Sequence, residues 1–172
     1  MNILIQGPPG TGKTTAIKKI IKLLKNCQGF YTEEIREKGE RVGFLVRNLD
    51  GKEEVFAHKD FNTSCRVGKY RVDVEKFENI ALPVLEKGLK EGKILIVDEI
   101  GKMEIFSEKF KEKIEEALKS SSTVIATLPQ KITDEIKKII NGKNYRIVLL
   151  TRTTRDKVPS LVLDLLEKKI DL

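Results

Sequence analysis

The sequence predicts a three-layer α/β fold with a mainly parallel central sheet and an antiparallel β meander after the first helix. Three observations support this fold class. A short apolar run passes through a glycine-rich turn into a helical pattern, the middle of the chain has strand-like patterning, and buried strands then alternate with amphipathic helices. A chain of 172 residues suits one full core, so we expect a single domain, 1–172, with the meander at 28–72 inside it.

The first predicted strand covers residues 2–6, and the helix after the glycine-rich turn has apolar side chains at positions 17, 20, 21 and 24. Residues 29–35 have the pattern of a second strand. Residues 42–49 and 53–58 face each other across Asp50-Gly51, a dipeptide that favours tight hairpin turns. These segments form the predicted meander.

Strands and helices alternate over the rest of the chain. A continuous run of aliphatic residues indicates a strand that is buried on both faces at 93–98, and residues 124–127 have the pattern of another buried strand. Residues 145–150 form the last predicted strand of the central sheet. Helical spacing of apolar residues predicts helices at 74–89, 108–118 and 132–140 and a last helix from Pro159 onward. Asp73 and Ser107 stand where they can cap the first two of these helices.

A complete phosphate-binding pattern, G-x-x-x-x-G-K-[ST] or Walker A, follows the first strand. Glycines at three of its positions let backbone N–H groups turn inward around phosphate, and the helix that follows adds its positive end. The lysine can reach the β- and γ-phosphates, the threonine after it can ligate Mg²⁺, and the next threonine lies near the α-phosphate. The alternative is a glycine-rich turn without a ligand. The residues that we expect to bind nucleotide here are Gly7, Pro8, Pro9, Gly10, Thr11, Gly12, Lys13, Thr14 and Thr15.

Two acidic residues, Asp98 and Glu99, end the buried strand 93–98, in the form of a Walker B motif. An aspartate at this place can hold Mg²⁺ opposite Thr14, and a glutamate just beyond the strand can orient or deprotonate the water that attacks the γ-phosphate. A carboxylate pair that ends a strand can also be an ordinary solvated turn. Both acids at one strand are typical of P-loop NTPases with an added central strand, such as RecA-like proteins.

Three further segments make the resemblance specific: Arg41-Val42-Gly43-Phe44, Val67-Gly68-Lys69-Tyr70-Arg71-Val72-Asp73 and Asp98-Glu99-Ile100-Gly101-Lys102-Met103-Glu104. Together with the N-terminal phosphate loop they resemble the THEP1 family of nucleoside-triphosphatases over essentially the whole chain. The resemblance implies a RecA-like P-loop NTPase that hydrolyses ATP, GTP and other nucleoside triphosphates slowly, with Mg²⁺ and with broad base tolerance. It adds Gly101 to the expected nucleotide-binding residues.

For several other polar residues the sequence leaves more than one role possible. Thr127 could sense the γ-phosphate or the attacking water, or be an ordinary strand-end threonine. Arg152 and Arg155 follow the last strand, where one of them could contact base or phosphate. Arg41 could serve as an arginine finger, unless such an arginine arrives from another molecule. Thr154 stands where the family usually has asparagine, which weakens a base contact at that position.

The composition indicates which kinds of binding partner and which cellular location to expect. The net charge of +7 comes from dispersed lysines and arginines, which favours solvated helix faces over a nucleic-acid groove. We expect no signal peptide and no membrane span, two reduced thiols at Cys27 and Cys65, and a cytoplasmic protein with a thermophile-like charge bias. The oligomeric state stays open, a monomer included.

Two other functions share these motifs. A P-loop nucleotide or small-molecule kinase would use the same loop to pass the γ-phosphate to an acceptor. A nucleic-acid-stimulated ATPase would explain the basic charge. The first needs an acceptor pocket and a lid, and the second needs a basic groove with exposed aromatic residues, neither of which is evident in the sequence.

Overall fold

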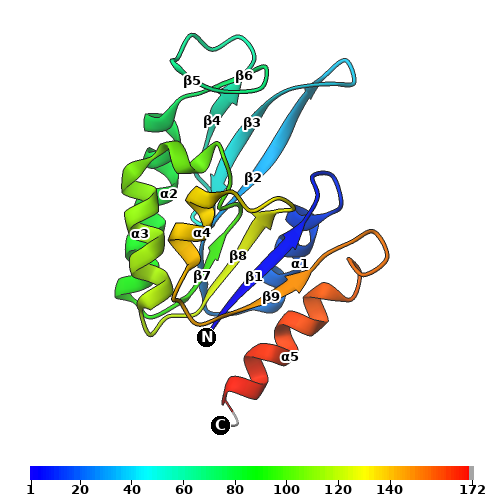
Figure 1. Cartoon of the computed structure of the whole chain (residues 1–172), viewed down its shortest axis with the longest axis vertical. Coiled ribbons are helices and arrows are strands. Elements are labelled where there is room, and N and C mark those ends of the chain that lie inside the picture. The colour runs from blue at the N-terminus through cyan, green and yellow to red at the C-terminus, as the bar shows by residue number, and fades with distance from the viewer. Residues whose placement is uncertain (171–172) are drawn as a thin grey trace.

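A computed structural model describes residues 1–170, with side chains described as far as Lys168. The described chain forms one nine-stranded sheet in the order β5-β6-β4-β3-β2-β7-β8-β1-β9 and Figure 1 shows helices on both of its faces. The strands are β1 (Asn2–Gly7), β2 (Cys27–Glu37), β3 (Glu40–Asn48), β4 (Glu53–His58), β5 (Cys65–Val67), β6 (Tyr70–Val72), β7 (Ile94–Val97), β8 (Val124–Pro129) and β9 (Tyr145–Leu149). The helices are α1 (Lys13–Leu23), α2 (Val74–Lys90), η1 (Glu104–Phe106, a 3₁₀ turn), α3 (Glu108–Lys119), α4 (Asp134–Ile140) and α5 (Val158–Ile170).

The central strands are parallel, as predicted. β1 pairs with β8 on one side and β9 on the other, and β8 pairs with β7. One strand, β8, therefore separates β1 from β7, which is the added central strand that the acidic pair indicated. Because all these strands run the same way, the loop after β1 and the acids after β7 lie at one edge of the sheet.

The meander occupies the other half of the sheet. β2 joins the halves, since it is parallel to β7 and antiparallel to β3. Its pairing with β7 ends at Phe30 opposite Val97, so the rest of β2 runs on with β3 alone as a hairpin beyond the end of β7 (Figure 1). The Asp50-Gly51 turn between β3 and β4 is confirmed, with Gly51 at a φ of 91°.

The short hairpin of β5 and β6 was not predicted. Its three-residue strands are too brief to show a periodic pattern, and they meet across Gly68-Lys69. A glycine followed by one residue is a recognised two-residue hairpin loop, and Gly68 has a φ of 58°. This dipeptide was the available signal.

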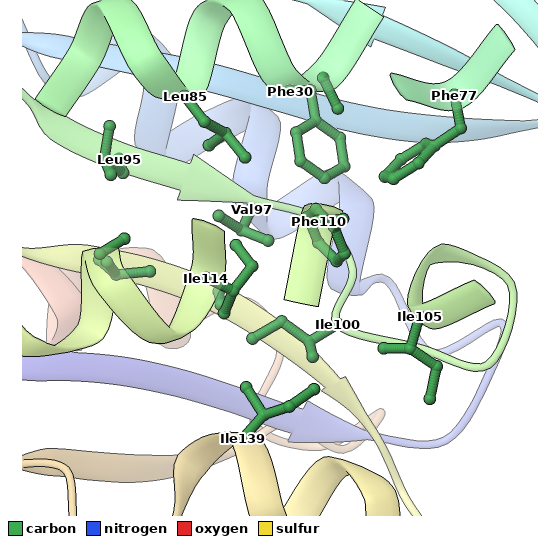
Figure 2. Close-up of a cluster of buried hydrophobic side chains, with 14 of the residues drawn as sticks. Phe30, Phe77, Leu85, Leu95, Val97, Ile100, Ile105, Phe110, Ile114 and Ile139 are labelled. Atoms are coloured by element: carbon green, nitrogen blue, oxygen red, sulfur yellow. The ribbon is translucent and has the colours of Figure 1, made fainter. Parts of the chain in front are cut away.

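Two apolar clusters fill the spaces between the layers. One lies between the sheet and α2, α3 and α4, and the other lies between the sheet and α1 and α5. Three of the phenylalanines in the larger cluster, Phe30, Phe77 and Phe110, meet edge to face with ring centroids 5.1–5.8 Å apart (Figure 2). This geometry places the positive ring edges against negative faces. The three-layer prediction is confirmed.

Helix starts follow the predicted capping residues. The Asp73 side chain accepts a hydrogen bond from the Lys76 N–H, and the Ser107 hydroxyl accepts one from the Phe110 N–H at 3.0 Å. Each bond satisfies a backbone donor that the first helical turn leaves free. α3 therefore begins immediately after the loop that carries the acidic pair, which anchors the end of that loop.

Within residues 1–170, none of the helices has the length and apolar character needed to span a bilayer. The cytoplasmic location expected from the sequence stays a prediction.

The aromatic cluster should dominate the stability of the α2 face. Phe77 is 1% exposed, so Phe77→Ala removes a buried ring and leaves a cavity against Phe30 and Phe110. The free energy of unfolding should fall by about 3–5 kcal/mol in urea titrations. Asn79→Ala, at an exposed position of the same helix, should change it by less than about 0.5 kcal/mol. A loss below about 1 kcal/mol for Phe77→Ala would contradict the assigned packing.

Candidate active site

The phosphate loop bends tightly between β1 and α1. Gly10 and Gly12 have φ values of 74° and 102°, in the left-handed region that favours glycine. The Thr11 hydroxyl donates to the Pro8 carbonyl at 2.6 Å and braces the loop from inside. Helix α1 starts at Lys13, so its unpaired N–H groups face the concave side of the turn.

Lys13 is where the loop and the acidic strand end meet. Its ammonium group lies 2.7 Å from Glu99 Oε2 and donates to the Leu128 carbonyl at 3.0 Å. The lysine is only 9% exposed, although its charged end belongs to a site that must admit a ligand. An ammonium group has three donors, and these two contacts leave one for a phosphate oxygen.

Asp98 is 2% exposed and is held by hydroxyl groups from two elements. Oδ2 accepts from Thr14 of α1 at 2.8 Å, and Oδ1 accepts from Thr127 of β8 at 2.6 Å. Burial raises the pKa of Asp98 to about 6, against the lowering effect of these bonds and of a bond from the Thr32 backbone. Thr127 was predicted as a sensor or a plain strand-end residue, and the structure places its hydroxyl on Asp98.

Glu99 differs from its neighbour in exposure. Its side chain is 24% exposed while Asp98 is almost completely enclosed, so Glu99 is the acid of the pair that solvent can reach. The two adjacent acids therefore have different surroundings: Asp98 is fixed by hydroxyl donors, and Glu99 is paired with the lysine of the phosphate loop.

A third carboxyl group, that of Glu104, lies beside the pair and was not among the predicted site residues. Glu104 is 5% exposed and opens the short turn η1. A Cβ atom built on Gly101 would lie 2.5 Å from Glu99 Oε1 and 3.1 Å from Glu104 Oε1, so Gly101 leaves room for both groups. The only sequence signal was the place of Glu104 in the D-E-I-G-K-M-E segment.

The three arginines with open roles lie in different places. The Arg155 side chain packs on the phosphate loop, where a Cβ on Gly12 would lie 3.4 Å from Arg155 Cδ. Arg41 lies in the β2–β3 hairpin and donates to the Tyr70 hydroxyl at 2.8 Å and to Glu34 at 3.2 Å.

Arg152 is exposed in the loop after β9, and the predicted contact residues Pro9 and Thr15 are exposed on the phosphate-loop side. These positions bring Arg155 to the loop and leave the role of Arg152 as a prediction.

Comparisons with known proteins show the family of the chain. A family model described as NTPase matches residues 2–163. The nucleoside-triphosphatase THEP1 of Thermotoga maritima is 43% identical over 167 residues, which cover 97% of this chain and 96% of that protein.

Two solved structures have the same fold. The crystal structure of THEP1 from Aquifex aeolicus matches with a TM-score of 0.89 and 38% identity, covering 97% of this chain and 99% of that one. The solution structure of a human cancer-related nucleoside triphosphatase matches with a TM-score of 0.83 and 33% identity, covering 97% of each chain. The predicted P-loop NTPase fold class and family are thereby confirmed, and the chain belongs to the THEP1 family of nucleoside-triphosphatases.

Proposed function

We propose that the chain hydrolyses nucleoside triphosphates to diphosphate and phosphate, with Mg²⁺, and with Glu99 as the residue that orients the attacking water. The observation that carries the proposal is the 2.7 Å contact between Lys13 Nζ and Glu99 Oε2. This contact places Lys13, which can bind the γ-phosphate, next to the partly exposed carboxylate of Glu99. A water molecule oriented by Glu99 would then be close to the phosphate that it attacks.

The phosphate loop supplies the binding energy for any triphosphate. Its inward N–H groups, the N-terminus of α1 and Lys13 meet the negative charge without reading the base. These groups stay in place as charge moves toward the leaving oxygen, so they also stabilise the transition state.

Thr14 and Asp98 form a suitable pair of ligands for Mg²⁺. A threonine hydroxyl and an aspartate carboxylate are hard oxygen donors, which this ion prefers, and they lie 2.8 Å apart. Bound there, the ion would neutralise charge on the β- and γ-phosphates. Thr127 keeps the Asp98 carboxylate oriented through its 2.6 Å hydrogen bond.

Exposure supports the division of labour between the two acids. A general base must be within reach of the water that it orients, and Glu99 is the more exposed of the pair. Asp98 has both carboxylate oxygens engaged by hydroxyl donors. Glu99 is therefore assigned to the water and Asp98 to the metal.

Broad base tolerance is supported by the position of Arg155. The side chain is exposed and packs beside Gly12 of the phosphate loop. A planar guanidinium that stacks on the face of a base distinguishes purines and pyrimidines poorly, because every base has such a face.

We also propose that residues 1–172 form one domain with the segment 28–72 built into it. The unbroken sheet from β5 to β9 supports this, because β2 belongs to the meander and pairs with the parallel half through β7.

Phosphoryl transfer to an acceptor is a second candidate, and one observation favours it. A cavity of about 740 Å³ opens beside the loop that carries the acids, and it is lined by residues of η1, the β5–β6 turn and the start of α4. Arg66, Lys102 and Phe106 are among them. Adding nucleosides and nucleoside monophosphates to a turnover assay separates the two candidates, because a phosphorylated acceptor in place of free phosphate identifies a kinase.

Substitutions at the central ion pair should separate binding from turnover. Glu99→Gln should lower kcat for phosphate release about a hundredfold or more while triphosphate affinity persists, since it removes the base and keeps the shape. Lys13→Ala should weaken triphosphate binding roughly ten- to hundredfold through the lost charged contact. Lys19→Ala, on the exposed face of α1, is the matched control. Wild-type turnover in Glu99→Gln would disprove the assignment of Glu99.

Removing the Arg155 side chain should weaken the binding of all nucleoside triphosphates to a similar extent. Arg155→Ala should raise KM for ATP, GTP, CTP and UTP by a similar factor, about two- to fivefold, because an exposed cation–π contact is worth little and favours no base. Steady-state assays with the four triphosphates, with and without RNA and DNA, measure this. Lys157→Ala in the same loop is the control. A loss confined to one base would indicate specific recognition instead.

The buried Asp98 should make folding depend on pH when Mg²⁺ is chelated. Its pKa is about 6 in the folded chain against an ordinary value of 3.8, so the folded state holds the proton more tightly. That stabilisation is complete below pH 3.8 and is lost as the pH rises through 6. Between about pH 4 and pH 7, the free energy of unfolding of the wild type, measured in urea, should therefore fall by up to about 3 kcal/mol relative to that of Asp98→Asn. A pH-independent difference would contradict this.

A further inference from the structure

The proposed hydrolysis leaves Glu104, whose carboxyl group lies beside the acidic pair, without a role. Among the side chains that the structure describes, none forms a hydrogen bond or ion pair with its carboxyl group, and its own backbone N–H is its contact. Its oxygens are not orphaned, since Thr63 Oγ1 is the one buried side-chain polar atom without a hydrogen-bond partner among the described residues. A carboxyl group that is only 5% exposed is nevertheless costly to keep in its charged form. Its place in the fold therefore needs a functional explanation.

The loop after β7 aims Glu104 at Glu99. The Ile105 N–H donates to the Gly101 carbonyl at 3.0 Å, which closes the loop and turns the Glu104 side chain back over Gly101. The two glutamate carboxyl groups share the space that a larger residue at 101 would fill. In Figure 2 the neighbouring Ile100 and Ile105 point into the apolar cluster with Phe110, so both sides of Glu104 in the chain are anchored.

The surroundings favour the protonated form of Glu104. Burial raises its pKa well above the ordinary range, and the carboxylates of Glu99 and Asp98 raise it further, while Lys13 acts in the opposite direction. An ionised carboxylate can only accept hydrogen bonds, whereas a protonated one also has an O–H to donate. Enzymes use buried, neutral carboxylic acids as hydrogen-bond donors in this way.

We propose that Glu104 is a positioning residue for Glu99, whose carboxyl group donates the hydrogen bond that orients Glu99 toward water when Lys13 turns to the phosphates. The inference rests on the proposed function, in which Glu99 orients the water. Lys13 is the cation that the structure places on Glu99, at 2.7 Å. When Lys13 contacts the γ-phosphate, the Lys13–Glu99 ion pair breaks. Glu99 then has Glu104 as its neighbouring hydrogen-bond donor across Gly101.

The test compares two substitutions of similar size. Glu104→Gln keeps an N–H donor, so kcat should stay within about threefold of wild type. Glu104→Leu removes the donor, so kcat should fall about ten- to hundredfold, as for other residues that orient a reacting group. KM and the affinity for a non-hydrolysable triphosphate should be unchanged in both. The melting temperature of Glu104→Leu should not fall, because leucine removes an acid whose charged form burial disfavours.

Glu112→Gln, exposed on α3, is the matched control and should behave as wild type. Gly101→Ala tests the same contact with Glu104 intact, because its methyl group enters the shared space. It should lower kcat, and it replaces Glu104→Leu as the test if the leucine variant does not fold. The double variant Glu99→Gln with Glu104→Leu should be no slower than Glu99→Gln, since Glu104 acts through Glu99.

Wild-type kcat in Glu104→Leu, or in Gly101→Ala where the leucine variant does not fold, would overturn the inference. A loss of kcat that glutamine does not restore, with a lowered melting temperature, would assign Glu104 to structure alone and would also overturn it. Failure of the proposed function gives a different result, since Glu99→Gln would then turn over normally. If Glu99→Gln is inactive while Glu104→Leu is normal, the inference alone fails.

Discussion

The hydrogen bonds to the buried Asp98 carboxylate are the contacts on which the site depends. Thr14 reaches it from α1 and Thr127 from β8, so one carboxylate connects the phosphate loop, the acidic strand end and the strand between them. This connection requires β8 to lie between β1 and β7, as it does in the sheet. Its geometry then sets where Lys13 and Glu99 meet.

The site concentrates acids where burial opposes their charge. Asp98 and Glu104 are both nearly enclosed, and burial raises the pKa of each. Hydroxyl donors offset this for Asp98, whereas Glu104 has no such donors among the described side chains. The arrangement costs folding free energy and, in the proposed mechanism, would supply a metal ligand and a hydrogen-bond donor, which is how functional sites commonly depart from the best packing.

Most elements were predictable because their signals are local. Asp73 and Ser107 cap helices by bonds to residues three positions on, and the Asp50-Gly51 turn depends on two residues. The short β5–β6 hairpin was missed because strands of three residues have no usable period. The hairpin extension of β2 beyond β7 also escaped prediction, since only the pairing partner tells where a strand leaves the sheet.

The sequence by itself determined the phosphate loop, the acidic pair and the family, because each depends on neighbouring residues whose spacing defines the geometry. Only the tertiary structure decided that Thr127 holds Asp98, that Arg155 packs on Gly12, and that Glu104 faces Glu99. These contacts join residues of different strands or opposite sides of one loop. They depend on strand order and on the path of the chain after β7, and neither of these is written in local spacing.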